Sequence, residues 1–186
     1  CESAYASKED TLFHTTMTGV CLGQVCTTPL VEYGAKALED CKNNITSYEL
    51  QEVVLSIIVS TGLVSNFTTN KDDLFYYNSS LAHAFYNGST VVHETESHRH
   101  GEIVAFGVLC LLAADKNYSE LERIAKFNKS VGLPTTLKDI GIVRDYVDAI
   151  VRKSTLTTEW KFKHADMNEQ KFKAAILEAD SFGEKI

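Results

Sequence analysis

Residues 101–114 read GEIVAFGVLCLLAA, and this stretch decides the fold class. Glu102 is its only charged residue, and the rest is apolar or small on every side of a helix. A helix that is apolar all round is typical of the centre of a domain, where other elements cover each of its faces. The sequence therefore predicts a buried central helix here, with the remaining elements packed around it.

Apolar residues recur at helical spacing on both sides of this stretch. Pro29 suits the first turn of a helix that runs to about residue 41, with Thr27 or Thr28 as its N-cap. The spacing of Thr46 and Glu49 is that of a capping box, which predicts a helix from there to residue 63. Residues 53–59 are apolar on nearly all sides and predict a second buried central helix. Further helices are expected over residues 11–26, 81–86, 119–129, 143–153 and 168–179, with a short turn after Thr135 and Thr136 and a loop over 66–78. We therefore expect an all-α, multi-helix bundle that forms one domain over residues 1–186.

Composition restricts the partners of this chain. It has 186 residues, a net charge of −7 and scattered rather than clustered Lys and Arg. Nucleic-acid binding and docking on an anionic membrane both need a basic patch, so neither is expected. The longest apolar runs, residues 53–59 and 103–114, are too short to span a bilayer. No signal peptide is visible, and because the chain opens at Cys1 we expect that an upstream segment is missing.

The five cysteines form no CxxC pair. They are interpreted as reduced, mostly buried thiols of a cytoplasmic protein. Six N-x-[ST] sequons, at Asn44, Asn66, Asn78, Asn87, Asn117 and Asn128, keep a secreted, glycosylated binding module open as an alternative. A chain rich in Asn, Ser and Thr explains the sequons without glycosylation, and we favour that explanation.

The histidines are unevenly distributed. Four of the six, His83, His93, His98 and His100, fall in one stretch. His83 is predicted on a short helix and His100 at the start of the buried helix, with a turn between them that can bring the two imidazoles to one ion. Neutral imidazole is a common ligand of Zn²⁺ and Fe²⁺. A core or solvated role for each histidine remains the plainer alternative at this point.

Two histidines are too few for a catalytic metal site, so a carboxylate has to join them. Glu94, Glu96 and Glu102 are local candidates, although Glu102 suits the N-terminus of a helix better than a metal ion. A closed structural site of His93, His98 and His100 is a further possibility.

Residues 98–112 (HRHGEIVAFGVLCLL) contain the pattern H-G-E-x-V-A-F-G, and residues 81–88 (LAHAFYNG) before them contain the pattern H-A-x-x-N-G. Residues 130–141 (SVGLPTTLKDIG) and 174–183 (AAILEADSFG) are two further segments. Together, and in the family's order, the four segments resemble the glycerol dehydrogenase family of iron-containing (group III) alcohol dehydrogenases. The related dehydroquinate synthases share a similar H-G-E motif.

The resemblance implies a two-domain enzyme in which an N-terminal α/β domain binds NAD and a C-terminal helical domain binds Zn²⁺ or Fe²⁺. This chain resembles the helical domain. The implied metal ligands are His83, His100 and an aspartate expected upstream of Cys1, so the chain alone should bind metal poorly and should not turn over substrate. The implied activity is NAD-linked oxidation of a small alcohol or polyol, or the reverse reduction, by a homo-oligomer.

Two departures from the family pattern leave the substrate open. Tyr86 stands where glycerol dehydrogenases usually carry another histidine, and residues 66–78 are longer than usual. Tyr86 and Tyr77 are the candidate substrate-binding residues, and no catalytic residue is assigned. A 2-hydroxy or 2-oxo acid dehydrogenase and a dehydroquinate synthase-like lyase remain alternatives.

Overall fold

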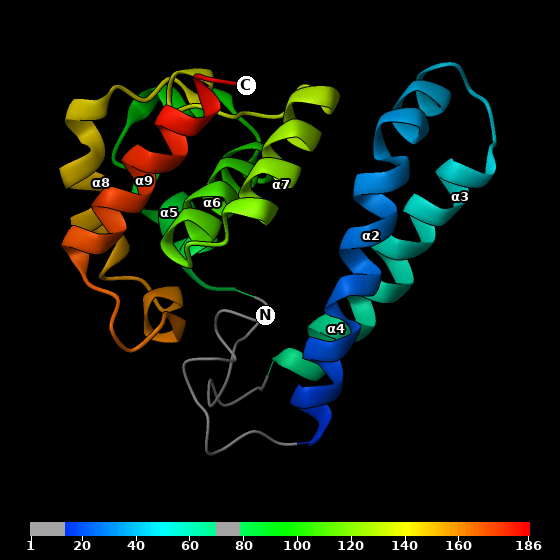
Figure 1. Ribbon diagram of the computed structural model, residues 1–186, viewed down its shortest axis with the longest axis horizontal. Coiled ribbons are helices and arrows are strands. Elements are labelled where there is room, and N and C mark those ends of the chain that lie inside the picture. The colour runs from blue at the N-terminus through cyan, green and yellow to red at the C-terminus, as the bar shows by residue number, and fades with distance from the viewer. Residues whose placement is uncertain (1–13, 70–78) are drawn as a thin grey trace. The chain divides into compact units, whose positions relative to one another are not determined.

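The computed structural model describes residues 14–69 and 79–186, and each element of regular structure in these two ranges is helical (Figure 1). The predicted all-α fold is confirmed. The chain divides into two compact units, residues 1–78 and 79–186. The single domain over residues 1–186 stays a prediction. Tyr77 lies outside the described residues.

The first unit is a helical hairpin. Its first arm is α2 (His14–Lys42), and its second arm runs through α3 (Tyr48–Leu55), the π-helical turn η1 (Ser56–Ser60) and α4 (Thr61–Thr68), all of which pack on α2. Ser47, with extended backbone, is the N-cap of α3, and its hydroxyl accepts the Leu50 N–H at 3.1 Å. The predicted N-cap at Thr46 is wrong by one residue. The predicted helix end at residue 63 is also wrong, because the π-helical turn carries the helix on to Thr68.

Pro29 lies inside α2, so the predicted boundary between two helices at residues 26–29 is wrong. Proline lacks the N–H that would bond to the carbonyl four residues earlier, which here is that of Val25. The buried Ser56 hydroxyl compensates from the other arm, lying 2.8 Å from the Cys26 carbonyl oxygen and 3.5 Å from that of Val25. The carbonyls that precede the proline therefore keep a donor, and the helix continues.

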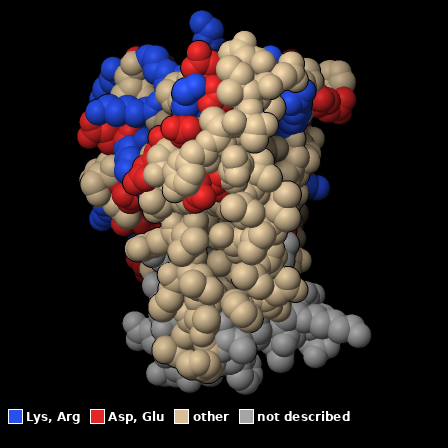
Figure 2. Space-filling view, turned by 90° about the vertical axis from the view of Figure 1, so that its right-hand side faces the viewer, with Lys and Arg blue, Asp and Glu red and all other residues tan. Residues whose placement is uncertain are grey.

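The helix predicted to be central and buried at residues 53–59 is instead mostly exposed. Ile58 is 68% exposed and Ile57 54% exposed, because α2 covers one side of this arm. Figure 2 shows a broad area of uncharged side chains, and residues 53–70 contain no charged residue. Residues 53–59 are apolar on all sides, which predicted packing partners on all sides, but within the described hairpin only α2 packs against them.

This arm is also longer than its apolar run. Residues Tyr48–Thr68 form 21 continuous helical residues, which by length and composition alone could cross a membrane. The prediction that the apolar stretches of this chain are too short to span a bilayer is therefore too strong. Core helices pass the same test, so one such helix is weak evidence for a span, and the absence of a membrane partner stays a prediction.

The second unit is built around α6 (His100–Ala114), against which α5 (Leu81–Ser89), α7 (Tyr118–Val131) and α9 (Glu169–Gly183) pack (Figure 1). Its other elements are η2 (His93–Ser97), η3 (Lys138–Ile140), η4 (Arg144–Tyr146), α8 (Val147–Ser154) and η5 (Glu159–Phe162). Phe106, Leu109 and Cys110 of α6 are fully buried, which confirms the predicted central helix. The short helix η5 was not predicted.

Helix α5 continues three residues beyond its predicted end at residue 86. Gly88, which follows that predicted end, lies against α8, where an added Cβ would come within 2.6 Å of the Ile150 carbonyl oxygen. The residue is needed for close packing of two helices rather than for a turn.

A buried carboxylate joins α9 to the segment before it. Asp180 Oδ1 accepts the Leu137 N–H at 2.8 Å, and Oδ2 accepts from Arg144 Nε at 2.6 Å. Asp139 closes the predicted turn by accepting the Thr135 and Thr136 N–H groups at 2.9 Å each. Residues 130–141 and 174–183, two of the segments that resemble the family, thus form one structural contact.

The structure tests part of what the sequence predicted for the cysteines and for the glycosylation sequons. The four described cysteines are free thiols, and Cys21 and Cys41 are exposed, so the expectation of mostly buried thiols is wrong. Asn128 is buried and its amide nitrogen donates to the Pro134 carbonyl at 3.3 Å, which opposes glycosylation at that sequon.

Candidate metal centre

The close crossing of α5 and α6 brings the two candidate ligands together. An added Cβ at Gly107 of α6 would lie 2.4 Å from the Ala82 carbonyl oxygen, so only glycine allows this approach. Phe85 and Phe106 pack edge to face beside it, with ring centroids 5.3 Å apart. His83 follows Ala82 directly, and His100 begins α6 two turns before Gly107.

The His83 and His100 rings have centroids 5.5 Å apart with a tilt of 42°. Two Zn–N bonds of about 2.05 Å at a tetrahedral angle place imidazole centroids roughly 5 Å apart. The observed separation fits two histidines that share one ion. The predicted juxtaposition of these residues across a turn is therefore present in the structure, while their role as ligands stays a prediction.

The protonation state of His83 suits a metal ligand. Its pKa is lowered, first by burial and then by His100, while Glu159 acts in the opposite direction. A lowered pKa favours the neutral imidazole, which is the form that binds metal.

Tyr86 lies beside this pair. Its ring is 4.2 Å from that of His100 and meets it edge on at 74°. Tyr86 follows His83 by three residues on α5, so both side chains lie on the same face of that helix. The candidate substrate residue thus adjoins the candidate ligands, although part of it also packs on the core.

The local carboxylates do not complete the site. Glu102 Oε2 accepts the Arg99 N–H at 3.0 Å, closing a capping box at the start of α6, and lies 3.4 Å from His98 Nδ1. Glu96 pairs with His93 at 3.2 Å on an exposed turn. Among residues 14–69 and 79–186 no group of three His, Cys, Asp or Glu side chains could hold a metal ion, so the closed site of three histidines is not formed.

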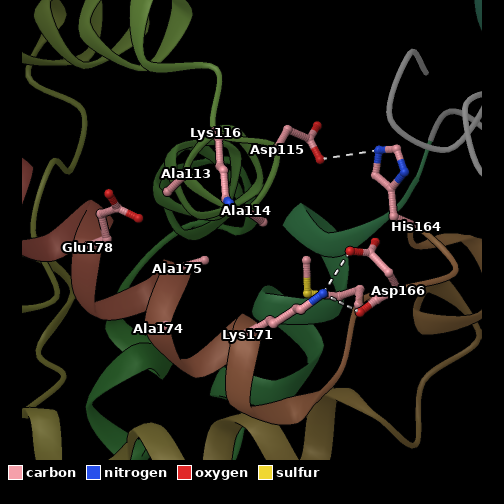
Figure 3. Close-up of a pocket in the computed structure, with 11 residues that line it drawn as sticks. Ala113, Ala114, Asp115, Lys116, His164, Asp166, Lys171, Ala174, Ala175 and Glu178 are labelled. Atoms are coloured by element: carbon pink, nitrogen blue, oxygen red, sulfur yellow. Dashed lines mark hydrogen bonds and ion pairs between the residues drawn. The ribbon is translucent and has the colours of Figure 1, made fainter.

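A cavity of about 430 Å³ lies at the other end of α6 (Figure 3). Two ion pairs lie within its lining: His164 is 3.5 Å from Asp115, and Lys171 is 2.7 Å from Asp166. Helix α6 has 15 residues. At about 1.5 Å per residue, the cavity is roughly 20 Å from His100. It is therefore separate from the histidine pair.

Over 127 residues, 68% of its length, the chain is 35% identical to the glycerol dehydrogenase of Thermotoga maritima. The chain is homologous to glycerol dehydrogenases. The glycerol dehydrogenase of Escherichia coli O6:H1 is 28% identical over 177 residues, 92% of the chain. No protein-family model matches the chain.

A solved structure shares the fold. The crystal structure of a probable glycerol dehydrogenase from Sinorhizobium meliloti 1021 superposes with a TM-score of 0.79 at 24% identity, over 99% of this chain and 49% of that one. The chain spans 32% and 46% of the length of the Thermotoga and Escherichia glycerol dehydrogenases. The first match covers 127 residues and the second 177, so both dehydrogenases are about twice as long as this chain.

The influence of Glu159 on the pKa of His83 was not predicted from the sequence. Glu159 lies 76 positions after His83 in a segment without strong helical periodicity, and no motif connects the two residues. Only the fold brings η5 against α5.

Proposed function

We propose that this chain provides the metal-binding part of a dehydrogenase that acts on a small alcohol or polyol, with His83 and His100 as metal ligands. The observation that carries the proposal is the pair of imidazoles, the half-buried His83 and the exposed His100, whose ring centroids lie 5.5 Å apart in a chain homologous to glycerol dehydrogenases. His83 and His100 would be two of the ligands, so the proposal includes a third from outside the described residues. NAD is proposed to bind to a further domain, as the resemblance implies.

The reaction would move a hydride and a proton. The alcohol carbon gives a hydride to the nicotinamide and the hydroxyl loses a proton, so that a carbonyl and the reduced cofactor form. A bound Zn²⁺ or Fe²⁺ supplies Lewis acidity at the substrate oxygen. His83 and His100 would hold the metal ion, and the Tyr86 ring limits the room beside His100.

Activity measurements test this proposal directly. The complete gene product is assayed for NADH formation with glycerol and small diols, before and after chelation and after addition of Zn²⁺ or Fe²⁺. His83→Ala and His100→Ala are compared with His93→Ala, which removes an exposed histidine outside the pair. Activity that metal restores, and that the first two variants lose, supports the proposal. Activity indifferent to chelation and to both residues contradicts it.

The same assay separates the remaining alternatives. Reduction of 2-oxo acids in preference to glycerol oxidation supports a hydroxy acid dehydrogenase, for which the departure at Tyr86 is the specific observation. Phosphate release without net NADH formation supports a dehydroquinate synthase-like lyase. Glycans in the mass spectrum of native material support the secreted binding module. A homo-oligomer in the cytoplasm remains part of the proposal.

A further inference from the structure

The cavity at the far end of α6 is bounded by three segments of the second unit (Figure 3). These are the end of α6, the loop that joins η5 to α9, and one face of α9. Its volume of about 430 Å³ falls within the range of roughly 300–1,000 Å³ that small-molecule sites occupy. The cavity lies roughly 20 Å from His100, so a ligand bound here would not touch the histidine pair.

The loop that forms one wall, residues 163–168, is fixed at both ends. Directly before it, the Phe162 carbonyl accepts from the Ser80 hydroxyl at 3.1 Å, and both residues are buried. Trp160 of η5 packs against Phe172 of α9 with ring centroids 5.4 Å apart. At the other end of the loop, Asn168 is the N-cap of α9. A wall that is held in this way is formed before a ligand arrives, so binding does not have to order it.

The buried part of the lining is apolar. It consists of Ala113 on α6, Met167 in the loop and Ala175 on α9. The two alanines are short and leave space between their helices, and the thioether chain of Met167 adapts its shape to an apolar group. A short aliphatic chain placed here would leave water, which favours its binding.

The charged groups of the lining differ in whether they are paired. Four of them form the two ion pairs described above. Lys116 and Glu178, which extend from the end of α6 and from α9, have no counter-ion within 4.0 Å among the residues that the structure describes (Figure 3). Glu178 raises the pKa of Tyr118, first through a hydrogen bond, and the neutral phenol does not cancel the charge of the carboxylate. The lining thus carries one uncompensated positive charge and one uncompensated negative charge.

Lys116 also has an unusual backbone conformation. Its φ of 55° lies in the left-handed region, which side chains other than those of glycine and asparagine rarely adopt. Its N–H donates to the Ala113 carbonyl at 3.0 Å and so closes the end of α6. Strained residues of this kind are frequent at ligand sites, which agrees with a role for the lysine side chain in binding.

We propose that this cavity binds an α-amino acid with an apolar side chain. Its carboxylate pairs with Lys116, its ammonium group pairs with Glu178, and its side chain packs on the buried apolar part of the lining. One molecule without net charge then meets both uncompensated charges. An anion would meet Lys116 but bring a like charge toward Glu178, and a cation would do the reverse. The site requires neither the metal nor the histidine pair.

Isothermal titration calorimetry on the complete gene product tests this proposal with three probes of one shape. L-leucine carries both charged groups, isocaproate lacks the ammonium group, and isoamylamine lacks the carboxylate. We expect saturable binding of leucine at one site per chain. Each of the other two probes should bind about tenfold more weakly or worse, because it loses one charge-assisted hydrogen bond.

Substitutions in the lining locate the binding site. Lys116→Gln and Glu178→Gln should each weaken leucine binding about tenfold. Ala174 lines the cavity and is exposed, so Ala174→Leu fills the space from the surface and should abolish binding. Lys126→Gln and Glu122→Gln remove exposed charges on α7 that pair with each other, and these control variants should bind leucine as wild type does.

Three results would overturn the proposal. The first is the absence of saturable leucine binding to the wild type. The second is isocaproate or isoamylamine binding as tightly as leucine, which would show a site for one charge only. The third is leucine binding that all three lining variants leave unchanged, which would place it elsewhere. Circular dichroism checks that each variant is folded, and if Ala174→Leu is not, the two glutamine variants at exposed positions decide.

Discussion

Replacing Gly107 with alanine should separate the two helices that carry the histidines. The added Cβ would lie 2.4 Å from the Ala82 carbonyl oxygen and 3.1 Å from two further backbone atoms of that residue, whereas ordinary contact begins at 3.4 Å. The obstructing atoms are backbone, so no side chain can rotate away. The helices must move apart locally by about 1 Å.

The expected cost follows from two opposing effects. Overpacking a close contact costs about 1–3 kcal/mol, and the upper end applies here because a whole helix has to shift. Alanine is better than glycine inside a helix by about 1 kcal/mol. We therefore expect a net loss of about 2 kcal/mol in the free energy of unfolding. For a protein of this size, that lowers the melting temperature by roughly 4–8 °C.

Circular dichroism during thermal and urea unfolding measures this change, and Zn²⁺ titration measures its effect on the site. Because His83 adjoins Ala82, the same displacement should weaken metal affinity. Gly101→Ala is the matched control in the same helix. Nothing lies within 4 Å of an added Cβ at that position, so stability should not fall. Gly107→Ala with wild-type stability would refute the steric argument.

Three further substitutions test other contacts. Asp180→Ala removes a buried carboxylate with two partners and should cost about 2–3 kcal/mol in urea unfolding. Glu184→Gln removes an exposed carboxylate that pairs with the same Arg144 and should cost less than about 1 kcal/mol. Ser56→Ala leaves the carbonyls before Pro29 without their cross-hairpin donor and should lower stability by about 1 kcal/mol; no change would show that water replaces the hydroxyl. Burial raises the pKa of Asp139, but hydrogen bonds from the backbone of the turn outweigh it and leave that pKa lowered. The ionised Asp139 carboxylate therefore stabilises the fold above its unfolded pKa of about 3.9, and this stabilisation is lost as the pH falls through its pKa in the folded state. Asp139→Asn should be less stable than wild type at pH 7 and should lose less stability on acidification. Parallel profiles of stability against pH would contradict this.

The sequence identified the central helix because residues 101–114 are apolar on all sides and need partners on all sides. The same reasoning failed at residues 53–59, where the described hairpin covers one side. Periodicity carries no information about which neighbours are present. Pro29 was misassigned for a related reason. The donor that lets α2 continue past it is a hydroxyl 27 positions later, in the other arm.

One part of the candidate site could likewise be predicted from the sequence, and another part could not. His83 and His100 could be paired from sequence, because a short helix, a turn and a helix start bring residues 17 positions apart together. The place of Glu159 could not be predicted, since it depends on the packing of a segment far along the chain.

The anchors of α5 have a consequence for the order in which the protein assembles during synthesis. Ser154 donates to the Ala84 carbonyl at 2.8 Å across 70 positions, and Ser80 donates to the Phe162 carbonyl across 82. Both histidines leave the ribosome long before either partner does. Contacts that close such long loops form late, because the chain between their ends must first be restricted. A nascent chain that ends near residue 140 should therefore present both imidazoles before α8 and η5 fix the position of α5.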